Sequence, residues 1–245
     1  MVTDHNGSTP SIFTYAVNAT TGALTQIGTN IPTVGSGPLV ITPSGEFAYI
    51  SNSNSIAMYR LDPTTGVPGK IDADVIVFNS GVILGPSGKF IYAASPQSQD
   101  SVPSITVFAI DPATGRLSQI AGSPFAFPPG WADPFTRYYP SFHPSGKFLY
   151  LANGGRTGVF AIDPETGAPS EIAGSPFVVS PFDNGGYMTI DPSGRVGYGT
   201  SCDTFPGVCE IISSTIDVTT GAPTTVGRLL LETLPAHLTI TGTVP

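Results

Sequence analysis

The sequence predicts an all-β fold, and three observations support that prediction. Glycine and proline are abundant, at 29 and 25 of 245 residues, which leaves little room for long helices. Hydrophobic residues reach 40%, including 14 Phe and 9 Tyr, so the chain can build a packed core. Two turn signatures also recur along the chain in a fixed order, as expected for short strands joined by tight turns.

The first recurring turn is Pro-Ser-Gly, at residues 43–45, 86–88, 144–146 and 192–194. Proline sets φ for the first turn position and glycine accepts a positive φ at the end, so the tripeptide favours a tight hairpin. An aromatic-rich run follows each copy, at residues 47–49, 90–92, 148–150 and 196–198. The first and third residues of each run share one face of a strand, so each run predicts a strand with an aromatic stripe.

The second recurring turn is Asp-Pro-x-Thr-Gly, at residues 62–66, 111–115 and 163–167, with weaker copies ending at Gly22 and Gly221. Its aspartate can accept hydrogen bonds from nearby backbone N–H groups, which stabilises the turn. The stretches just before two of these turns, residues 105–110 and 158–162, read as strands. The five Thr-Gly glycines are spaced 44, 49, 52 and 54 residues apart, which defines a repeated unit.

Each unit therefore contains four antiparallel strands, A to D. Pro-Ser-Gly joins A to B, Asp-Pro-x-Thr-Gly joins C to D, and variable loops make the other connections. Such a unit, repeated five times, is typical of a β-propeller blade, so we expect one propeller domain over residues 1–245. A single long β-sandwich is the alternative, but it would not need the same turns in the same order.

The two ends of the chain fit this arrangement. Residues 1–4 match strand B of a unit, and residues 237–241 match strand A. We therefore expect the C-terminal strand to complete the N-terminal blade and remove an open edge. The five units would form either a closed five-bladed ring or part of a seven-bladed one.

Three long motifs resemble a known family. Residues 143–153 (HPSGKFLYLAN), 108–125 (FAIDPATGRLSQIAGSPF) and 160–177 (FAIDPETGAPSEIAGSPF) are similar to lactonase-type seven-bladed β-propellers, whose relatives include 6-phosphogluconolactonase and carboxymuconate cyclase. The resemblance covers nearly the whole chain, although only five units are visible rather than seven. It implies hydrolysis of a sugar-type lactone, a carboxylic-ester hydrolase reaction, without a cofactor.

Strand parity sorts the connections onto two faces. The repeated turns share one face, and the variable loops share the other, where function in scaffolded folds usually resides. Three variable loops carry most of the chemically able side chains, and the starts of the A strands are expected at a channel rim. Equivalent rim positions are Gly81, Tyr139, Tyr187 and His237.

Three of these variable-face residues are the predicted catalytic group. His237 would be the base that activates water, since the pKa of histidine suits that role. Arg137 would stabilise the oxyanion or bind a substrate carboxylate, and Tyr139 would donate a hydrogen bond. Each has a structural alternative: a solvated rim histidine, an ion pair of Arg137 with Asp133, and an aromatic packing residue.

The predicted substrate-binding residues lie on the same face: Trp131, Tyr138, Asn79, Asp183, Asn184 and Tyr187. Trp131 could stack on a sugar-like ring or simply pin its loop, and the tyrosines could be packing residues. A cation held by Asp183, Asn184 and Asn79 is a weaker alternative, because no ligand spacing supports it, and no metal is predicted. His143 lies in a Pro-Ser-Gly turn on the opposite face, so it is not a candidate.

Charge and hydropathy exclude some partners. Charged residues make up only 11% and the net charge is −8, whereas nucleic-acid binding needs clustered basic residues. No apolar run approaches the roughly 18 residues of a membrane-spanning helix. We expect a monomer that binds a small lactone or sugar-like ligand.

Cys202 and Cys209 form either a disulfide across a short loop or two free thiols; no other Cys or His lies nearby in sequence to suggest a metal site. A disulfide would indicate an oxidising compartment, so a periplasmic or secreted location is favoured. A cytoplasmic location stays open, because no signal peptide is visible after Met1. The alternative function is a non-catalytic extracellular binding or scaffold propeller.

Overall fold

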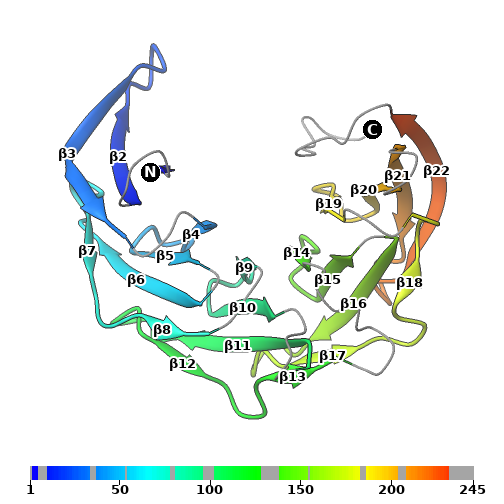
Figure 1. Ribbon diagram of the computed structural model, residues 1–245. Coiled ribbons are helices and arrows are strands. Elements are labelled where there is room, and N and C mark those ends of the chain that lie inside the picture. The colour runs from blue at the N-terminus through cyan, green and yellow to red at the C-terminus, as the bar shows by residue number, and fades with distance from the viewer. Residues whose placement is uncertain are drawn as a thin grey trace. The chain divides into compact units, whose positions relative to one another are not determined.

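The computed structural model describes residues 2–4, 10–33, 37–52, 54–77, 81–95, 102–127, 138–153, 155–182, 186–203 and 208–231. These residues form strands and turns and no helix, so the predicted all-β class is confirmed. No part of the described chain provides a long apolar helix of the kind that crosses a membrane. The strands form separate antiparallel sheets, one for each repeated unit (Figure 1).

The sheets follow the predicted order of strands along the chain. The first sheet contains β1 (Val2–Asp4), β2 (Ser11–Val17) and β3 (Leu24–Pro32), and the second contains β4 (Leu39–Ile41), β5 (Phe47–Ser51), β6 (Ser55–Leu61), β7 (Pro68–Lys70) and β8 (Val75–Ile76). The third sheet contains β9 (Gly81–Leu84), β10 (Phe90–Ser95), β11 (Ser104–Ile110), β12 (Leu117–Gln119) and β13 (Phe125–Ala126), and the fourth contains β14 (Tyr139–Phe142), β15 (Phe148–Asn153), β16 (Arg156–Ile162), β17 (Pro169–Glu171) and β18 (Phe177–Val178). The fifth sheet contains β19 (Met188–Ile190), β20 (Val196–Cys202), β21 (Cys209–Ile216) and β22 (Pro223–Leu231). These sheets are β-propeller blades, as predicted.

One detail differs from the prediction. In the second, third and fourth sheets the outer strand D is split into two short strands that pair with the same C strand. At two of these breaks the hydroxyls of Ser123 and Ser175 accept hydrogen bonds from Val107 and Val159 N–H, at 2.9 and 3.0 Å. Each serine belongs to a Gly-Ser-Pro-Phe sequence, residues 122–125 and 174–177. This motif therefore replaces a missing ladder bond with a side-chain acceptor, because a buried N–H must be paired.

The first sheet agrees with the prediction that residues 1–4 form strand B, followed by strands C and D. It contains three strands among the described residues, and β1 lies at its edge. The predicted closing strand, residues 237–241, lies outside the described residues, so closure of the N-terminal blade stays a prediction.

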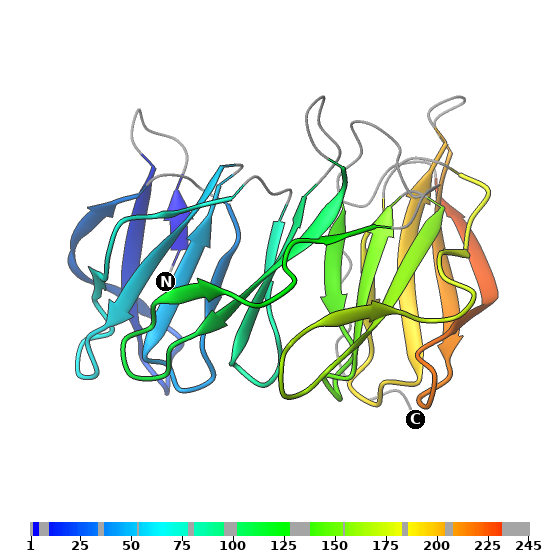
Figure 2. The same ribbon diagram turned by 90° about the horizontal axis from the view of Figure 1, so that it is seen from below.

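The chain divides into two compact units. Unit 1 contains residues 1–93 and 108–119, and unit 2 contains residues 94–107 and 120–245, so the division passes through the third sheet. In each unit we call the end of a sheet that carries the repeated turns the turn end, and the opposite end the loop end (Figure 2).

The predicted Asp-Pro-x-Thr-Gly turns form as expected. Asp62 Oδ1 accepts hydrogen bonds from the N–H groups of Thr64 and Thr65, at 3.0 and 2.7 Å. The backbone N–H of Thr65, its hydroxyl and the N–H of Thr64 together hold the pKa of Asp62 below its usual range. Backbone and hydroxyl donors act in the same way on Asp111, Asp163 and Asp217.

Unit 1 shows how the aromatic stripe is used. Tyr49 is completely buried, and its hydroxyl donates a 2.9 Å hydrogen bond to the carbonyl of Gly115, which ends the Asp-Pro-x-Thr-Gly turn of the following sheet, residues 111–115. The ring of Phe47 lies so close to Gly115 that an added Cβ would overlap it. Gly115 also has a φ of 73°, so both its conformation and its surroundings exclude a side chain.

Unit 2 repeats this contact with different residues. The hydroxyl of Tyr150 donates a 2.7 Å hydrogen bond to the carbonyl of Gly221, and the ring of Phe148 occupies the space of a Gly221 Cβ. We call this contact, in either unit, the aromatic latch. In both cases a Phe-x-Tyr strand packs on the Thr-Gly turn of the following sheet, which links the recurrence of the two motifs.

His143, at the turn end of unit 2, has a structural role consistent with its exclusion as a candidate. Its Nδ1 accepts a 3.1 Å hydrogen bond from Ser145 N–H, and its Nε2 lies 2.8 Å from the carbonyl oxygen of Gly194. The side chain is buried and joins turns of two successive sheets.

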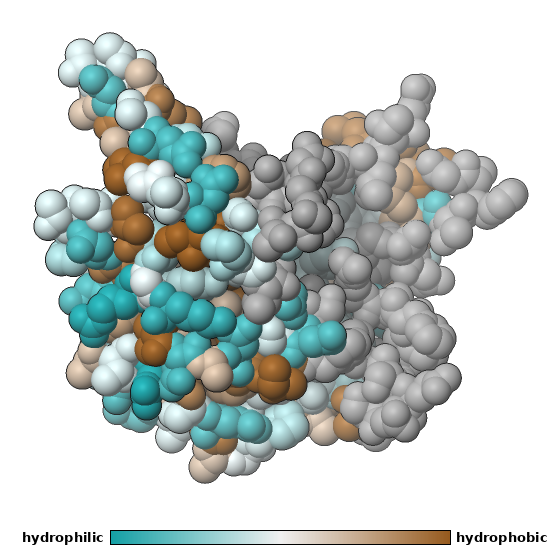
Figure 3. Space-filling view, turned by 60° about the vertical axis from the view of Figure 1, so that its left-hand side comes forward, coloured by the Kyte–Doolittle hydropathy of each residue, from teal (hydrophilic) through white to brown (hydrophobic). Residues whose placement is uncertain are grey.

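The surface of unit 1 carries single apolar side chains rather than an extended apolar face. Val17, Leu24 and Ile76 are exposed on it. Figure 3 shows this side as a mixture of hydrophilic and hydrophobic residues, which is ordinary for a folded surface.

Candidate functional site

Two of the predicted site residues meet at the loop end of unit 2. Tyr139 begins β14 and Tyr187 immediately precedes β19, so the first strands of two successive sheets bring them together. Their ring centroids lie 4.2 Å apart with an angle of 35° between the ring planes. Both side chains are half-buried, so part of this aromatic pair remains accessible to a ligand.

Tyr138, the neighbouring predicted binding residue, is placed differently. Its side chain is completely buried, and its ring meets that of Phe127 edge-on at 5.0 Å and 80°. Alternation along the chain turns Tyr138 into the core where Tyr139 turns out of it. Tyr138 therefore occupies the position of a packing residue, and a direct contact with a substrate does not fit this burial.

A small cavity adjoins Tyr187. Its volume, measured to the centre of a water molecule, is about 10 Å³, which is room for roughly one water. The lining residues are Ala152, Thr157, Val179, Gly186, Tyr187, Met188, Gly199, Thr200, Ile212 and Ser214.

The polar part of this lining includes an unpaired group. Thr200 is only 3% exposed, and its Oγ1 has no hydrogen-bond partner among the described residues. The backbone N–H of Thr200 is occupied, because it donates to the carbonyl of Tyr187 at 2.9 Å. A buried hydroxyl without a partner is costly, so this hydroxyl is a ready hydrogen-bonding group for a water or a ligand atom in the cavity.

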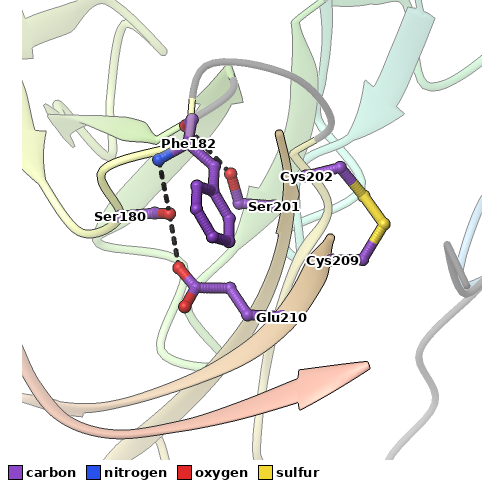
Figure 4. The surroundings of a disulfide bond; sticks show 6 residues. All are labelled: Ser180, Phe182, Ser201, Cys202, Cys209 and Glu210. Atoms are coloured by element: carbon purple, nitrogen blue, oxygen red, sulfur yellow. Dashed lines mark hydrogen bonds between the residues drawn. A yellow bond between two sulfur atoms is a disulfide. The ribbon is translucent and has the colours of Figure 1, made fainter. Parts of the chain in front are cut away.

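A carboxylate that the sequence analysis did not select lies beside the cavity. Glu210 of β21 is 2% exposed, and its Oε1 accepts a short hydrogen bond from the hydroxyl of Ser180 (Figure 4). Arg228 Nη1 of β22 lies 3.6 Å from the same oxygen. The sequence could have indicated Glu210, because it lies between a cysteine and two isoleucines. A charged residue in such an apolar strand usually needs a hydrogen-bond or ion-pair partner.

The two cysteines are joined by a disulfide in the structure. Cys202 ends β20 and Cys209 begins β21, and the two residues face each other across the ladder. The adjacent pair in that ladder is Ser201 and Glu210, so the disulfide joins the strands next to the buried carboxylate (Figure 4).

The remaining predicted site residues lie outside the described residues: His237, Arg137, Trp131, Asn79, Asp183 and Asn184. Their roles stay predictions. Within the described ranges there is no group of three or more His, Cys, Asp or Glu that could hold a metal ion.

Comparison with known proteins identifies the fold. No protein-family profile matches the sequence, and no curated protein sequence does either. Solved structures do match, and they show that the chain has a β-propeller fold.

Three similar structures illustrate this. A Bacteroides uniformis protein provisionally named a 6-phosphogluconolactonase gives a TM-score of 0.68 at 19% identity, over 94% of this chain and 70% of that one. A Bacteroides fragilis protein with the same provisional name gives 0.60 at 18% identity, over 98% and 83%. A protein of unknown function from Desulfotomaculum acetoxidans gives 0.64 at 16% identity, over 90% and 62%. At these identities the likeness establishes the fold alone.

Proposed function

We propose that the chain is a lactonase-like hydrolase that opens a sugar-type lactone at the loop end of unit 2. The accessible Tyr139–Tyr187 pair, with the unpaired Thr200 hydroxyl beside it, is the observation that supports this proposal. An aromatic face suits the apolar side of a sugar-like ring, and a buried hydroxyl suits one of its polar atoms. The likeness in fold to proteins provisionally named 6-phosphogluconolactonases agrees with this substrate class.

The proposed reaction uses residues predicted from the sequence. His237 takes a proton from water, whose oxygen attacks the lactone carbonyl carbon, and Arg137 stabilises the resulting oxyanion. The ring C–O bond then breaks, the departing oxygen takes the proton that His237 received, and the product is an open-chain hydroxy acid. Tyr139 donates a hydrogen bond, and Tyr187 supports the ring of the substrate.

The test is a hydrolysis assay of the purified protein on a panel of aldonolactones, with and without a phosphate group. We expect ring opening by the wild-type protein, a large loss of kcat in His237→Ala, and a raised KM with nearly unchanged kcat in Tyr187→Ala. His143→Gln is the matched control, because His143 lies at the turn end. Absence of hydrolysis across the panel would exclude the enzyme.

The size of the cavity favours a second candidate, a non-catalytic binding propeller. Room for about one water beside Tyr187 accepts a single polar group rather than a whole sugar ring. A ligand would then rest on the exposed aromatic pair without being converted. Calorimetric binding of an aldonolactone that remains intact, and whose affinity falls in Tyr187→Ala, would identify this case.

We also propose that the protein works in an oxidising compartment, outside the cytoplasm. The Cys202–Cys209 disulfide supports this location, because such bonds persist mainly there. Thiol titration of protein from fractionated cells tests it. Free thiols at both cysteines in the native protein would contradict it.

A further inference from the structure

A strap of chain in unit 2, residues 179–182, connects the fourth sheet to the fifth and leads to Tyr187. Its first residue, Val179, lines the cavity beside Tyr187. The N–H groups of Val179 and Ser180 both donate to the carbonyl of Gly155, at 2.8 and 3.0 Å. A Cβ on Gly155 would overlap the carbonyl oxygens of Ser180 and Phe182, so only glycine allows the strap to approach this closely.

Side chains of the fifth sheet hold the strap along its length. The carbonyl of Val179 accepts hydrogen bonds from Arg228 Nη2 and from the hydroxyl of Thr225, at 3.0 and 3.3 Å. The carbonyl of Phe182 accepts a hydrogen bond from the Ser201 hydroxyl, at 3.0 Å (Figure 4).

Glu210 lies at the centre of these contacts. It accepts the hydrogen bond of Ser180, and the Ser180 oxygen in turn accepts the N–H of Phe182 at 3.0 Å. Arg228, which holds Val179, lies 3.6 Å from the same carboxylate oxygen. One buried carboxylate therefore orients both the serine and the arginine that hold the strap. We call Ser180, Ser201, Glu210 and Arg228 the clamp.

The position of the clamp links it to the aromatic pair. Val179 reaches the cavity lining before the connection, and Tyr187 lines the same cavity after it. The clamp holds the Phe182 carbonyl, and Thr200 N–H holds the Tyr187 carbonyl. A strap that shifts at Glu210 would move the wall of the cavity and, with it, the ring of Tyr187 against Tyr139.

We propose that Glu210 is a positioning residue, which through Ser180 and Arg228 fixes the strap and so sets the Tyr139–Tyr187 pair of the site. The Cys202–Cys209 disulfide assists, because it joins β20 and β21 at the ladder position next to Ser201 and Glu210. This role in catalysis rests on the proposed function, whereas its effect on the aromatic pair does not.

The test measures the aromatic pair directly. In protein labelled with 13C-tyrosine, ring resonances of Tyr139, Tyr187 and Tyr49, which belongs to unit 1, are assigned with single Tyr→Phe variants. In Glu210→Gln, which keeps the shape but removes the charge, we expect the Tyr139 and Tyr187 resonances to shift while that of Tyr49 stays. Glu165→Gln, in an exposed turn of unit 2, is the matched control and should move none of them.

A second variant is used if Glu210→Gln disturbs the fold as a whole. If Glu210→Gln moves all three resonances, Ser180→Ala replaces it, because that variant removes only the hydroxyl between the carboxylate and the strap. The proposal is overturned if the folded variant leaves the Tyr139 and Tyr187 resonances in place.

Kinetics separate this proposal from the proposed function. If the wild type hydrolyses a lactone, Glu210→Gln should lower kcat/KM by about tenfold to a hundredfold, as expected for misplacement of a site by a remote change. Most of this loss should lie in KM, since the reacting groups themselves are intact. If the wild type hydrolyses no lactone, the function fails, but the resonance shifts still decide the role of Glu210.

Discussion

The turn end and the loop end of the sheets are stabilised in different ways. At the turn end the same aromatic latch occurs in both units, with Phe47, Tyr49 and Gly115 in one and Phe148, Tyr150 and Gly221 in the other. At the loop end of unit 2, the clamp around Glu210 and the Tyr139–Tyr187 pair use residues that lie outside the two recurring turn motifs. Repetition therefore marks residues that hold the fold, and departure from it marks residues that can hold a ligand.

The largest expected effect tests the latch at the turn end. Gly115→Ala should lower the free energy of unfolding by about 2–5 kcal/mol, because an alanine is strained at positive φ and its Cβ overlaps Phe47. Gly22→Ala is the matched control: its φ is 72°, close to the 73° of Gly115, and nothing lies within 4 Å of its added Cβ. Urea unfolding measures both, and equal losses would show that the Phe47 contact adds nothing.

The second largest effect on stability is expected at the loop end, from loss of the disulfide. Replacing both Cys202 and Cys209 by alanine removes a cross-link between residues seven apart, which should lower the free energy of unfolding by about 2–3 kcal/mol. Reduced wild-type protein in urea should show a similar loss. Unchanged stability in both would mean that the disulfide serves only local positioning at the loop end.

A smaller loss of stability is expected at the aromatic latch. Tyr150→Phe removes the hydroxyl that pairs with the Gly221 carbonyl, and should cost about 1–2 kcal/mol at neutral pH. Tyr139→Phe, in a half-buried ring, should cost less. A larger loss in Tyr139→Phe would reverse the comparison between the two ends.

Three buried tyrosines, two of them in the latch, also predict an alkaline limit. Burial raises the pKa of Tyr49, Tyr92 and Tyr150 above their usual range, so these side chains stay neutral in the folded protein. Unfolded tyrosines ionise near pH 10, so above that pH the unfolded state binds fewer protons and stability falls as pH rises. Each buried tyrosine should contribute at most about 1.4 kcal/mol per pH unit, and Tyr150→Phe should reduce the slope. An unchanged slope in that variant would contradict the prediction.

The smallest effect on stability is expected at the cavity. Thr200→Val should raise the free energy of unfolding by up to about 1 kcal/mol, because it removes a buried hydroxyl that has no partner among the described residues. It should nevertheless weaken binding of an aldonolactone, measured by calorimetry. A large loss of stability with unchanged binding would make Thr200 a residue of the fold like those of the latch.

The sequence by itself determined the repeat and the turns. Proline, aspartate and glycine act through φ and through hydrogen bonds within a few residues, so Asp62 and its equivalents could be predicted from local chemistry. It also showed that Tyr139 and Tyr187 occupy equivalent places in successive units, because a repeat defines equivalence without coordinates.

Which of these side chains contact one another depends on strand register and on how the sheets pack. Tyr138 and Tyr139 are neighbours in sequence, yet one is in the core and the other is in the aromatic pair, because the register of β14 sets their orientation. The contacts of Gly115 with Phe47, and of Glu210 with Ser180, join residues 68 and 30 positions apart. Such contacts depend on how sheets pack, and local preferences carry no information about packing over that distance.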